Sequence, residues 1–178
     1  GIRCMARFLW DRGITREDKM DIETLAGKKS IKIELQGGQP GNIEVNMGQP
    51  LFGPEQIPAN LKGEDEVFGH KILAAGQTFT VNLVSMGNPH CVIFVDSSQG
   101  LKKIDLDKWG PVLEEHPLFP NKINVEFVYV QNKESLDMRV WERGVGQTLA
   151  CGTGACASAV AAVKLGKTKP GIVVVNLP

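Results

Sequence analysis

The chain has 178 residues, of which 42% are apolar, so it can bury a sizeable core in one large or two small domains. Its 20 basic and 20 acidic residues balance, and no block of Lys and Arg is interleaved with aromatic side chains, which argues against nucleic acid as a partner. No apolar run approaches the roughly 20 residues that span a bilayer, and no signal peptide is recognisable, so no membrane partner is expected.

The first part of the chain predicts a helix followed by paired strands. Residues 1–12 carry apolar side chains at helical spacing and end at a glycine. Residues 31–35 and 43–46 alternate between apolar and polar side chains, which is typical of half-buried strands in an antiparallel meander. Glycine and proline are dense in residues 48–58, which predicts a domain boundary near residue 49.

Beyond that boundary, the pattern predicts a mixed domain of strands and helices. The segment before Gly166 is rich in alanine, and its small side chains favour a helix that packs closely against its neighbours. Strands are expected at 67–74, 77–86, 90–96, 123–131, 135–142 and 172–175, and helices at 105–115 and 153–165.

Cysteine usage indicates reduced thiols rather than a scaffold of disulfides. The chain contains neither a C-x-x-C pair nor a Cys/His spacing suited to zinc, so no structural metal is expected. Thiols of this kind are typical of an intracellular compartment. The four cysteines are Cys4, Cys91, Cys151 and Cys156.

Cys151 stands directly ahead of the predicted last helix, followed by Gly152, Thr153 and Gly154. The free N–H groups and the dipole at a helix N-terminus stabilise a thiolate and can hold a carboxylate, while glycine allows a ligand to approach the backbone. The motif therefore predicts a base beside an anion-binding cradle. Alternatively, Cys151 is a small buried hydrophobe and the glycines form a tight turn.

Glu142 lies nine residues upstream, and strict alternation places it on the core-facing row of its strand. A carboxylate there could exchange protons with a nearby thiol, and Arg143 could hold a substrate carboxylate by a bidentate contact. An ordinary ion pair at the end of a strand is the alternative.

Two further segments carry candidate polar groups. Asn88 and His90 lie in a turn between two apolar runs, where an imidazole could transfer protons and an amide could bind a zwitterion. The alternative is that this segment only forms a hairpin turn. Asn124 opens a predicted strand and carries almost no signal by itself.

Together these segments are far more specific than any one of them, and the family resemblance that they support extends over essentially the whole chain. Four motifs, in this order and spacing, resemble the diaminopimelate epimerase family: Gly87-Asn88-Pro89-His90, Asn124 ahead of an apolar strand, Trp141-Glu142-Arg143-Gly144, and Ala150-Cys151-Gly152-Thr153-Gly154-Ala155.

The resemblance implies an α/β (α+β) fold of two pseudo-symmetric domains, in which a mixed or antiparallel sheet wraps around a central helix in each. Residues 1–49 would be the C-terminal part of a truncated first domain. Residues 50–178 would be the second domain without its last segment. The family's first catalytic cysteine would lie ahead of Gly1, so this chain is expected to be a fragment and inactive alone.

The implied activity is cofactor-independent epimerisation of LL-diaminopimelate to meso-diaminopimelate in lysine biosynthesis, by proton transfer between two cysteines. Neither a cofactor nor a metal is implied. The resemblance is compatible with a homodimer and with the cytoplasm or a plastid stroma as the location. It assigns the following residues: Cys151 as one catalytic cysteine, Glu142 as its partner, His90 as the residue that assists the other cysteine, and Asn88, Asn124, Glu142, Arg143, Gly152 and Thr153 as substrate-binding residues.

Three alternatives remain at this stage. A proline racemase or phenazine-biosynthesis type of isomerase would share the fold but act on another substrate. A cysteine hydrolase would use Cys151 with His90, although no residue that would orient the histidine is evident from the sequence. A non-catalytic module would bind the diamino acid without converting it.

Overall fold

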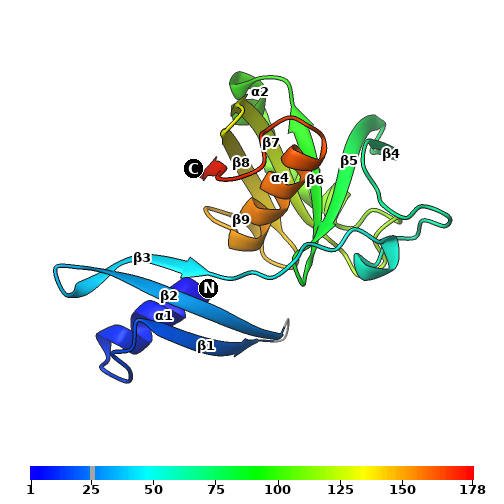
Figure 1. The fold of residues 1–178 in the computed structure, drawn as a ribbon. Coiled ribbons are helices and arrows are strands. Elements are labelled where there is room, and N and C mark those ends of the chain that lie inside the picture. The colour runs from blue at the N-terminus through cyan, green and yellow to red at the C-terminus, as the bar shows by residue number, and fades with distance from the viewer. Residues whose placement is uncertain (25–26) are drawn as a thin grey trace. The chain divides into compact units, whose positions relative to one another are not determined.

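A computed structural model describes residues 1–24 and 27–178. The chain divides into two compact units, residues 1–49 and residues 50–178 (Figure 1). Each unit has its own sheet and its own buried apolar cluster. Among the described residues, no helix combines the length and the apolar character needed to cross a bilayer.

The first unit is a helix packed against a three-stranded antiparallel sheet. Ala6 and Trp10 of the helix are buried against Ile31 and Ile33 of the central strand, as helical spacing and strand alternation require. The predicted helix and strand pair are confirmed, whereas the first strand was not predicted. The elements are α1 (Ile2–Asp11), β1 (Lys19–Thr24), β2 (Gly27–Gln36) and β3 (Gln39–Val45).

The second unit contains a seven-stranded mixed sheet. Its strands are β4 (His70–Ala74), β5 (Gln77–Ser85), β6 (Pro89–Val95), β7 (Asn124–Asn132), β8 (Ser135–Glu142), β9 (Gly146–Thr148) and β10 (Val174–Asn176). Six strands follow the order β10-β8-β7-β6-β5-β4, and β9 pairs with β8. The β6–β7 and β10–β8 pairs are parallel, and the others are antiparallel.

One face of this sheet carries the main apolar core. Leu106 and Leu113 pack there against Cys91, Val125 and Phe127 of β6 and β7. The segments that accompany this core are the short η1 (Pro54–Gln56), α2 (Ser98–Lys103) and α3 (Leu106–Glu114). The helix α3 confirms the prediction for residues 105–115, but α2 was not predicted, because its six residues are too short for a helical period to show.

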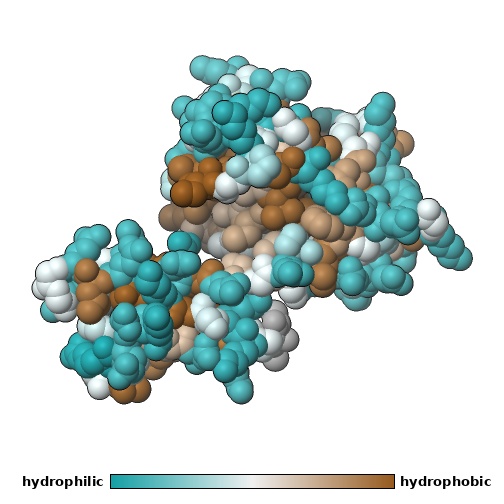
Figure 2. Space-filling view, in the orientation of Figure 1, coloured by the Kyte–Doolittle hydropathy of each residue, from teal (hydrophilic) through white to brown (hydrophobic). Residues whose placement is uncertain are grey.

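The helix α4 (Gly152–Lys164) packs against β5 to β8 (Figure 1). Its buried residues are small, which brings the helix axis close to the sheet as the alanine-rich sequence predicted. In Figure 2, apolar surface gathers over α4 and is surrounded by hydrophilic residues. Alternation along β6 and β7 turns His90 and Glu126 away from the apolar core that holds Cys91 and Phe127.

The predicted fold class is confirmed at this level. Both units are mixed α and β, and a helix lies against the sheet in each. The strand β9 was not predicted, because three residues between two turns carry no readable alternation.

Candidate active site

Cys151 is the N-cap residue of α4. Its backbone is extended, with φ −129° and ψ 108°, and its sulfur accepts a hydrogen bond from the N–H of Gly154 at 3.3 Å. The thiol thus takes the position that a serine or aspartate side chain often occupies at a helix start. The first turn of a helix leaves N–H groups without intrahelical partners, so Gly152 and Thr153 contribute donors beside this sulfur.

The surroundings of Cys151 favour the neutral thiol. The side chain is buried, and this desolvation raises the pKa of Cys151 above the ordinary thiol value. The hydrogen bonds with Thr153 and from the N–H of Gly154 act in the opposite direction, because they stabilise the thiolate. The carboxylates of Glu126 and Glu142 raise the pKa further. Both carboxylates therefore lie within electrostatic reach of the sulfur.

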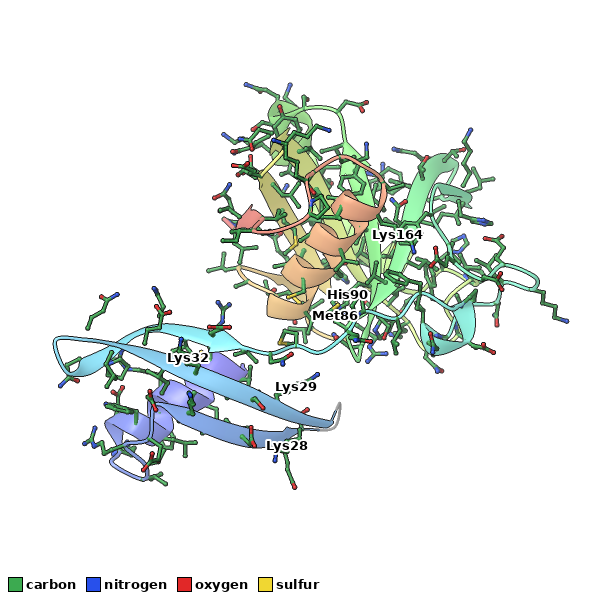
Figure 3. The ribbon with its side chains drawn as sticks, viewed as in Figure 1. Lys28, Lys29, Lys32, Met86, His90 and Lys164 are labelled. Carbon is green, nitrogen blue, oxygen red and sulfur yellow. The ribbon has the colours of Figure 1, made fainter. Side chains whose placement is uncertain are left out.

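Thr153 links Cys151 to the turn between β5 and β6. The hydroxyl oxygen of Thr153 lies 3.4 Å from the sulfur, and it accepts a hydrogen bond from the amide nitrogen of Asn88 at 3.2 Å. The amide oxygen of Asn88 lies 3.2 Å from Nε2 of His90. Figure 3 shows His90 near the end of α4 at which the helix begins, whereas Lys164 lies near the other end. The structure thus brings together Cys151, Thr153, Asn88 and His90.

Glu126 completes this arrangement and was missed by the sequence analysis. Its side chain is fully buried, and Oε1 lies 2.7 Å from Nδ1 of His90. A signal for it exists in the sequence, because it is a single charged residue within the apolar run of β7. A buried charge in such a run requires a partner, and His90 supplies it. We call Glu126, His90, Asn88, Thr153 and Cys151 the Cys151 network.

Gly154 is the point where α4 touches this network. A Cβ at this position would lie 2.6 Å from Oε1 of Glu126 and 3.2 Å from the sulfur of Cys151. The helix can therefore approach the carboxylate only because this residue has no side chain. Packing against Glu126 and Cys151 therefore accounts for a glycine at this helical position.

Asn124 holds three chain segments together. Its amide nitrogen donates to the carbonyl of Pro89 at 2.7 Å, and its amide oxygen accepts from the N–H of Arg143 at 3.0 Å. The side chain of Asn124 is buried. It therefore fixes the starts of β6 and β7 and the turn after β8 relative to one another, a role the sequence analysis did not foresee.

Glu142 and Arg143 lie at the end of β8 with different surroundings. One carboxylate oxygen of Glu142 accepts a hydrogen bond from the hydroxyl of Thr148. Arg143 is exposed, and its guanidinium donates to the carbonyl of Asn121 at 3.2 Å. Among the described residues, Glu142 forms no ion pair, so the alternative considered for it is not seen. Its carboxylate instead acts on the pKa of Cys151.

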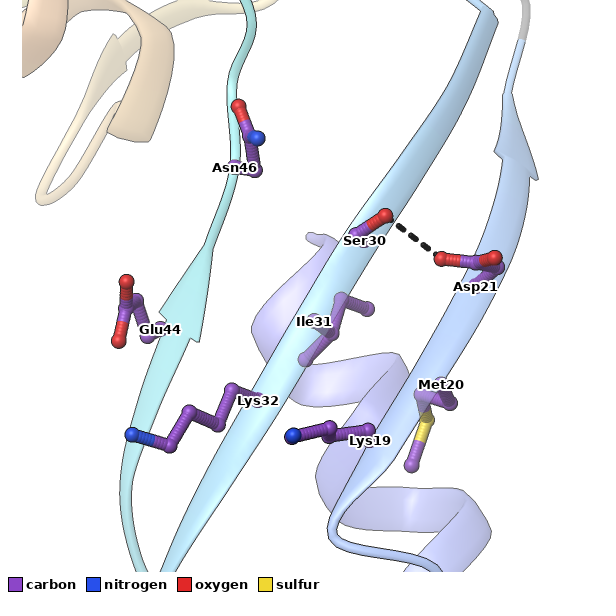
Figure 4. Close-up of a pocket in the computed structure, with 8 residues that line it drawn as sticks. All are labelled: Lys19, Met20, Asp21, Ser30, Ile31, Lys32, Glu44 and Asn46. Carbon is purple, nitrogen blue, oxygen red and sulfur yellow. Dashed lines mark hydrogen bonds between the residues drawn. The ribbon is translucent and has the colours of Figure 1, made fainter.

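A separate hollow of about 490 Å³ lies on the sheet of the first unit (Figure 4). Within it, Asp21 is hydrogen-bonded to Ser30 at 2.6 Å and paired with Lys28 at 2.8 Å, and the hydrogen bonds from Lys28 and Ser30 lower the pKa of Asp21. Its charged groups are exposed, and Asp21 is held by Lys28 and Ser30, so the hollow offers no buried acid or base. In the described part of the chain, no cluster of His, Cys, Asp or Glu could hold a metal ion.

Comparison with known proteins identifies relatives of the whole chain. The model of the diaminopimelate epimerase family matches residues 82–178. A curated diaminopimelate epimerase from Desulfitobacterium hafniense is 48% identical over the entire chain, which covers 61% of that protein. Another from Methanothermobacter thermautotrophicus is 43% identical over the entire chain and 60% of that protein. The chain thus spans about three fifths of the length of these relatives.

Solved structures with this fold have lower sequence identity. A probable proline racemase from Agrobacterium radiobacter matches with a TM-score of 0.67 at 18% identity, over 96% of this chain and 53% of that one. A hydroxyproline epimerase from Agrobacterium vitis matches with a TM-score of 0.64 at 16% identity, over 96% of this chain and 52% of that one. At such identities the likeness concerns the fold alone.

Proposed function

This chain belongs to the diaminopimelate epimerase family, and from that premise we propose that it carries one half of a two-thiol epimerisation site with Cys151 as its acid–base group. The observation that carries the proposal is the buried thiol at the N-terminus of α4, bound to Thr153 and through it to Asn88 and His90. The curated relatives are named diaminopimelate epimerases, so LL- and meso-diaminopimelate are the proposed substrates.

The proposed reaction inverts an α-carbon without a cofactor. A thiolate on one side removes the α-hydrogen, and the electron pair of the C–H bond stays on the substrate as a carbanion. The Cys151 thiol then donates its hydrogen to the opposite side of the same carbon and becomes the thiolate. Cys151 suits the donor role because burial raises its pKa and keeps the hydrogen on sulfur at neutral pH. The reverse reaction starts from the Cys151 thiolate.

The start of α4 would stabilise the carbanion. Negative charge from the broken C–H bond spreads into the adjacent α-carboxylate, and the N–H groups of Gly152 and Thr153 would meet that carboxylate at the positive end of the helix dipole. Such fixed donors need no reorganisation as charge develops. Gly152 has no side chain to hinder this approach. Glu142 would exchange the proton with Cys151, since its carboxylate acts on the pKa of the thiol.

The far end of the substrate would be held by the residues around the turn after β8. Arg143 is exposed there and can turn its guanidinium to a second carboxylate, for which its planar pair of donors is suited. Asn88 and Asn124 would contribute amide groups, although in this structure those of Asn124 bind backbone atoms. The second thiol is proposed to come from sequence ahead of Gly1, assisted by His90. Action in lysine biosynthesis, in the cytoplasm or a plastid stroma, and pairing as a homodimer are parts of the same proposal.

The test compares substrates rather than single variants. We would incubate a longer protein, in which the family's Cys-Gly-Asn segment precedes Gly1, with LL-diaminopimelate, meso-diaminopimelate and L-proline, and follow stereochemistry by chiral chromatography. Interconversion of both diaminopimelates without change in proline is expected. Conversion of proline but not diaminopimelate would favour the proline racemase type of isomerase. Assayed in parallel, the 178-residue chain is expected to bind diaminopimelate without epimerising it.

A further inference from the structure

The Cys151 network contains a buried carboxylate that the proposed mechanism does not use. Glu126 is fully buried in β7, and its Oε2 has no hydrogen-bond partner among the described residues. Its Oε1 lies against both Nδ1 of His90 and the first turn of α4 at Gly154. Burying a carboxylate without full hydrogen bonding is costly, so this position demands an explanation beyond packing.

The donors and acceptors of the network fix the hydrogens on His90. The amide nitrogen of Asn88 donates to Thr153, so the amide oxygen is the atom that faces Nε2 of His90. An amide oxygen can only accept, and Nε2 therefore carries a hydrogen. Nδ1 and Oε1 of Glu126 are 2.7 Å apart, so a second hydrogen lies between them in a hydrogen bond. Two hydrogens on this pair make it electrically neutral, whichever of the two residues holds the shared one.

The same directionality continues to the sulfur. The hydroxyl oxygen of Thr153 accepts from Asn88, so its own hydrogen is left for the sulfur of Cys151, 3.4 Å away. We propose that Glu126 is a positioning residue, which acts through His90 and the network to direct this hydroxyl hydrogen onto the sulfur of Cys151. A hydroxyl that donates to sulfur stabilises the thiolate, so by this route the carboxylate favours ionisation of Cys151, against the direct effect of its charge, which raises the pKa of the thiol.

This role has a sign opposite to that of a direct charge effect. A carboxylate acting through space opposes a nearby thiolate, and its removal would lower the pKa of Cys151. The Glu126→Gln variant removes the negative charge that balances the second hydrogen of the pair, so a neutral imidazole can hold its one hydrogen on Nδ1 and leave Nε2 as an acceptor. The amide of Asn88 can then flip so that its nitrogen donates to Nε2 and its oxygen faces Thr153. The hydroxyl of Thr153 would then donate to Asn88 instead of to the sulfur of Cys151. The indirect role therefore predicts a higher pKa for Cys151 in this variant.

The experiment measures the rate at which iodoacetamide alkylates Cys151 in the 178-residue chain as a function of pH, by peptide mass spectrometry. Glu126→Gln should move the midpoint upward by about one pH unit, the scale of one hydrogen bond to a charged group. The same substitution at exposed Glu134 is the matched control and should leave it in place. A downward shift, or a folded Glu126→Gln protein with an unchanged midpoint, would overturn the proposal.

A double-variant comparison identifies the route. Thr153→Val should raise the midpoint by itself, and adding Glu126→Gln should then produce no further rise, because both changes remove the same hydrogen bond. A full additional rise would mean that Glu126 does not act through Thr153.

A measurement on the unaltered chain covers the case in which Glu126→Gln fails to fold. The chain has three histidines, so ¹⁵N-resolved NMR of the imidazole rings can report on His90 separately. A hydrogen on Nε2 is expected, and an unprotonated Nε2 would overturn the proposal. The inference rests on the proposed function only in taking Cys151 as the working thiol. Neither the alkylation assay nor the NMR measurement needs a substrate, so both would still test the inference in a protein that does not epimerise diaminopimelate.

Discussion

Glu126 and Phe127 are neighbours in β7, and both side chains are fully buried, yet they serve opposite faces of the sheet. Phe127 joins the apolar core beside Leu106 and Leu113, where contact area provides the stability. Glu126 contacts His90 beneath the start of α4, where hydrogen bonding and the placement of hydrogens decide the energetics more than buried area does. Alternation along a strand thus lets two adjacent residues contribute to the apolar core and to the proposed acid–base site.

The two buried thiols repeat this contrast. Cys91 is fully buried in the apolar core, and desolvation together with the carboxylate of Glu126 raises its pKa well above the ordinary value. Cys151 is also buried, but two hydrogen bonds act against that rise. Burial by itself makes a thiol inert, and the hydrogen bonds with Thr153 and from the N–H of Gly154 distinguish Cys151, the proposed working thiol, from Cys91.

The largest effect is expected from truncating Phe127, the residue of this pair that lies in the apolar core. Phe127→Ala should lower the free energy of unfolding by about 3–5 kcal/mol, because it removes a large buried side chain and leaves a cavity. Urea denaturation would measure this loss. In the protein that remains folded, the pH profile of Cys151 alkylation should be unchanged. A shifted profile would mean that the two faces of the sheet are coupled.

Two glycines allow the same substitution on each face. Gly110→Ala would place a Cβ 2.2 Å from the ring of Trp141, and it should lower the free energy of unfolding by about 3 kcal/mol without altering Cys151. Gly154→Ala would press on Glu126 and on the sulfur, so it should also change the alkylation profile. Thermal unfolding and alkylation of both variants test this difference. Equal effects on Cys151 would contradict the assignment of the site to the α4 face.

Above about pH 8.5, the pH dependence of stability should include a contribution from Cys91. Its folded-state pKa is raised, so its contribution to stability is complete below the unfolded thiol pKa of about 8.5 and is lost as the pH rises above it. Cys91→Ala should remove that part of the decline in urea denaturation curves measured across this range. An identical decline in the variant would show that other groups cause it.

The smallest expected effect concerns the contact between α3 and the end of β8. Glu114 of α3 is buried and accepts hydrogen bonds from the indole of Trp141 at 2.7 Å and from the N–H of Gly144 at 2.8 Å. Glu114→Gln keeps the volume but cannot serve both donors equally, so a loss of about 1 kcal/mol is expected. Differential scanning calorimetry would measure it, with Glu115→Gln as the exposed control.

Much of this arrangement was readable in the sequence, because it depends on local patterns. Alternation predicted the main strands, and the small residues ahead of Gly166 predicted a closely packed helix with Cys151 at its start. The turn that carries Asn88 and His90 was also predicted, and the structure brings both residues to Cys151 through Thr153.

The rest depends on contacts between distant parts of the chain. Asn124 gave almost no signal, because its partners Pro89 and Arg143 are far from it in sequence. Glu126 was overlooked within an apolar run, although a charge at a buried strand position is itself a signal. Which face it occupies follows from alternation, but its pairing with His90 follows only from the parallel alignment of β6 and β7.

The central claim is that Cys151 is a proton-transferring thiol in a two-thiol site. The most direct test follows the α-hydrogen of LL-diaminopimelate in deuterated water, using the longer protein with the family's N-terminal segment. The account predicts that early meso product carries one deuterium while recovered LL substrate carries none, because different thiols act on the two sides, and that Cys151→Ala forms no product. Product formation by Cys151→Ala at the parent rate would contradict it.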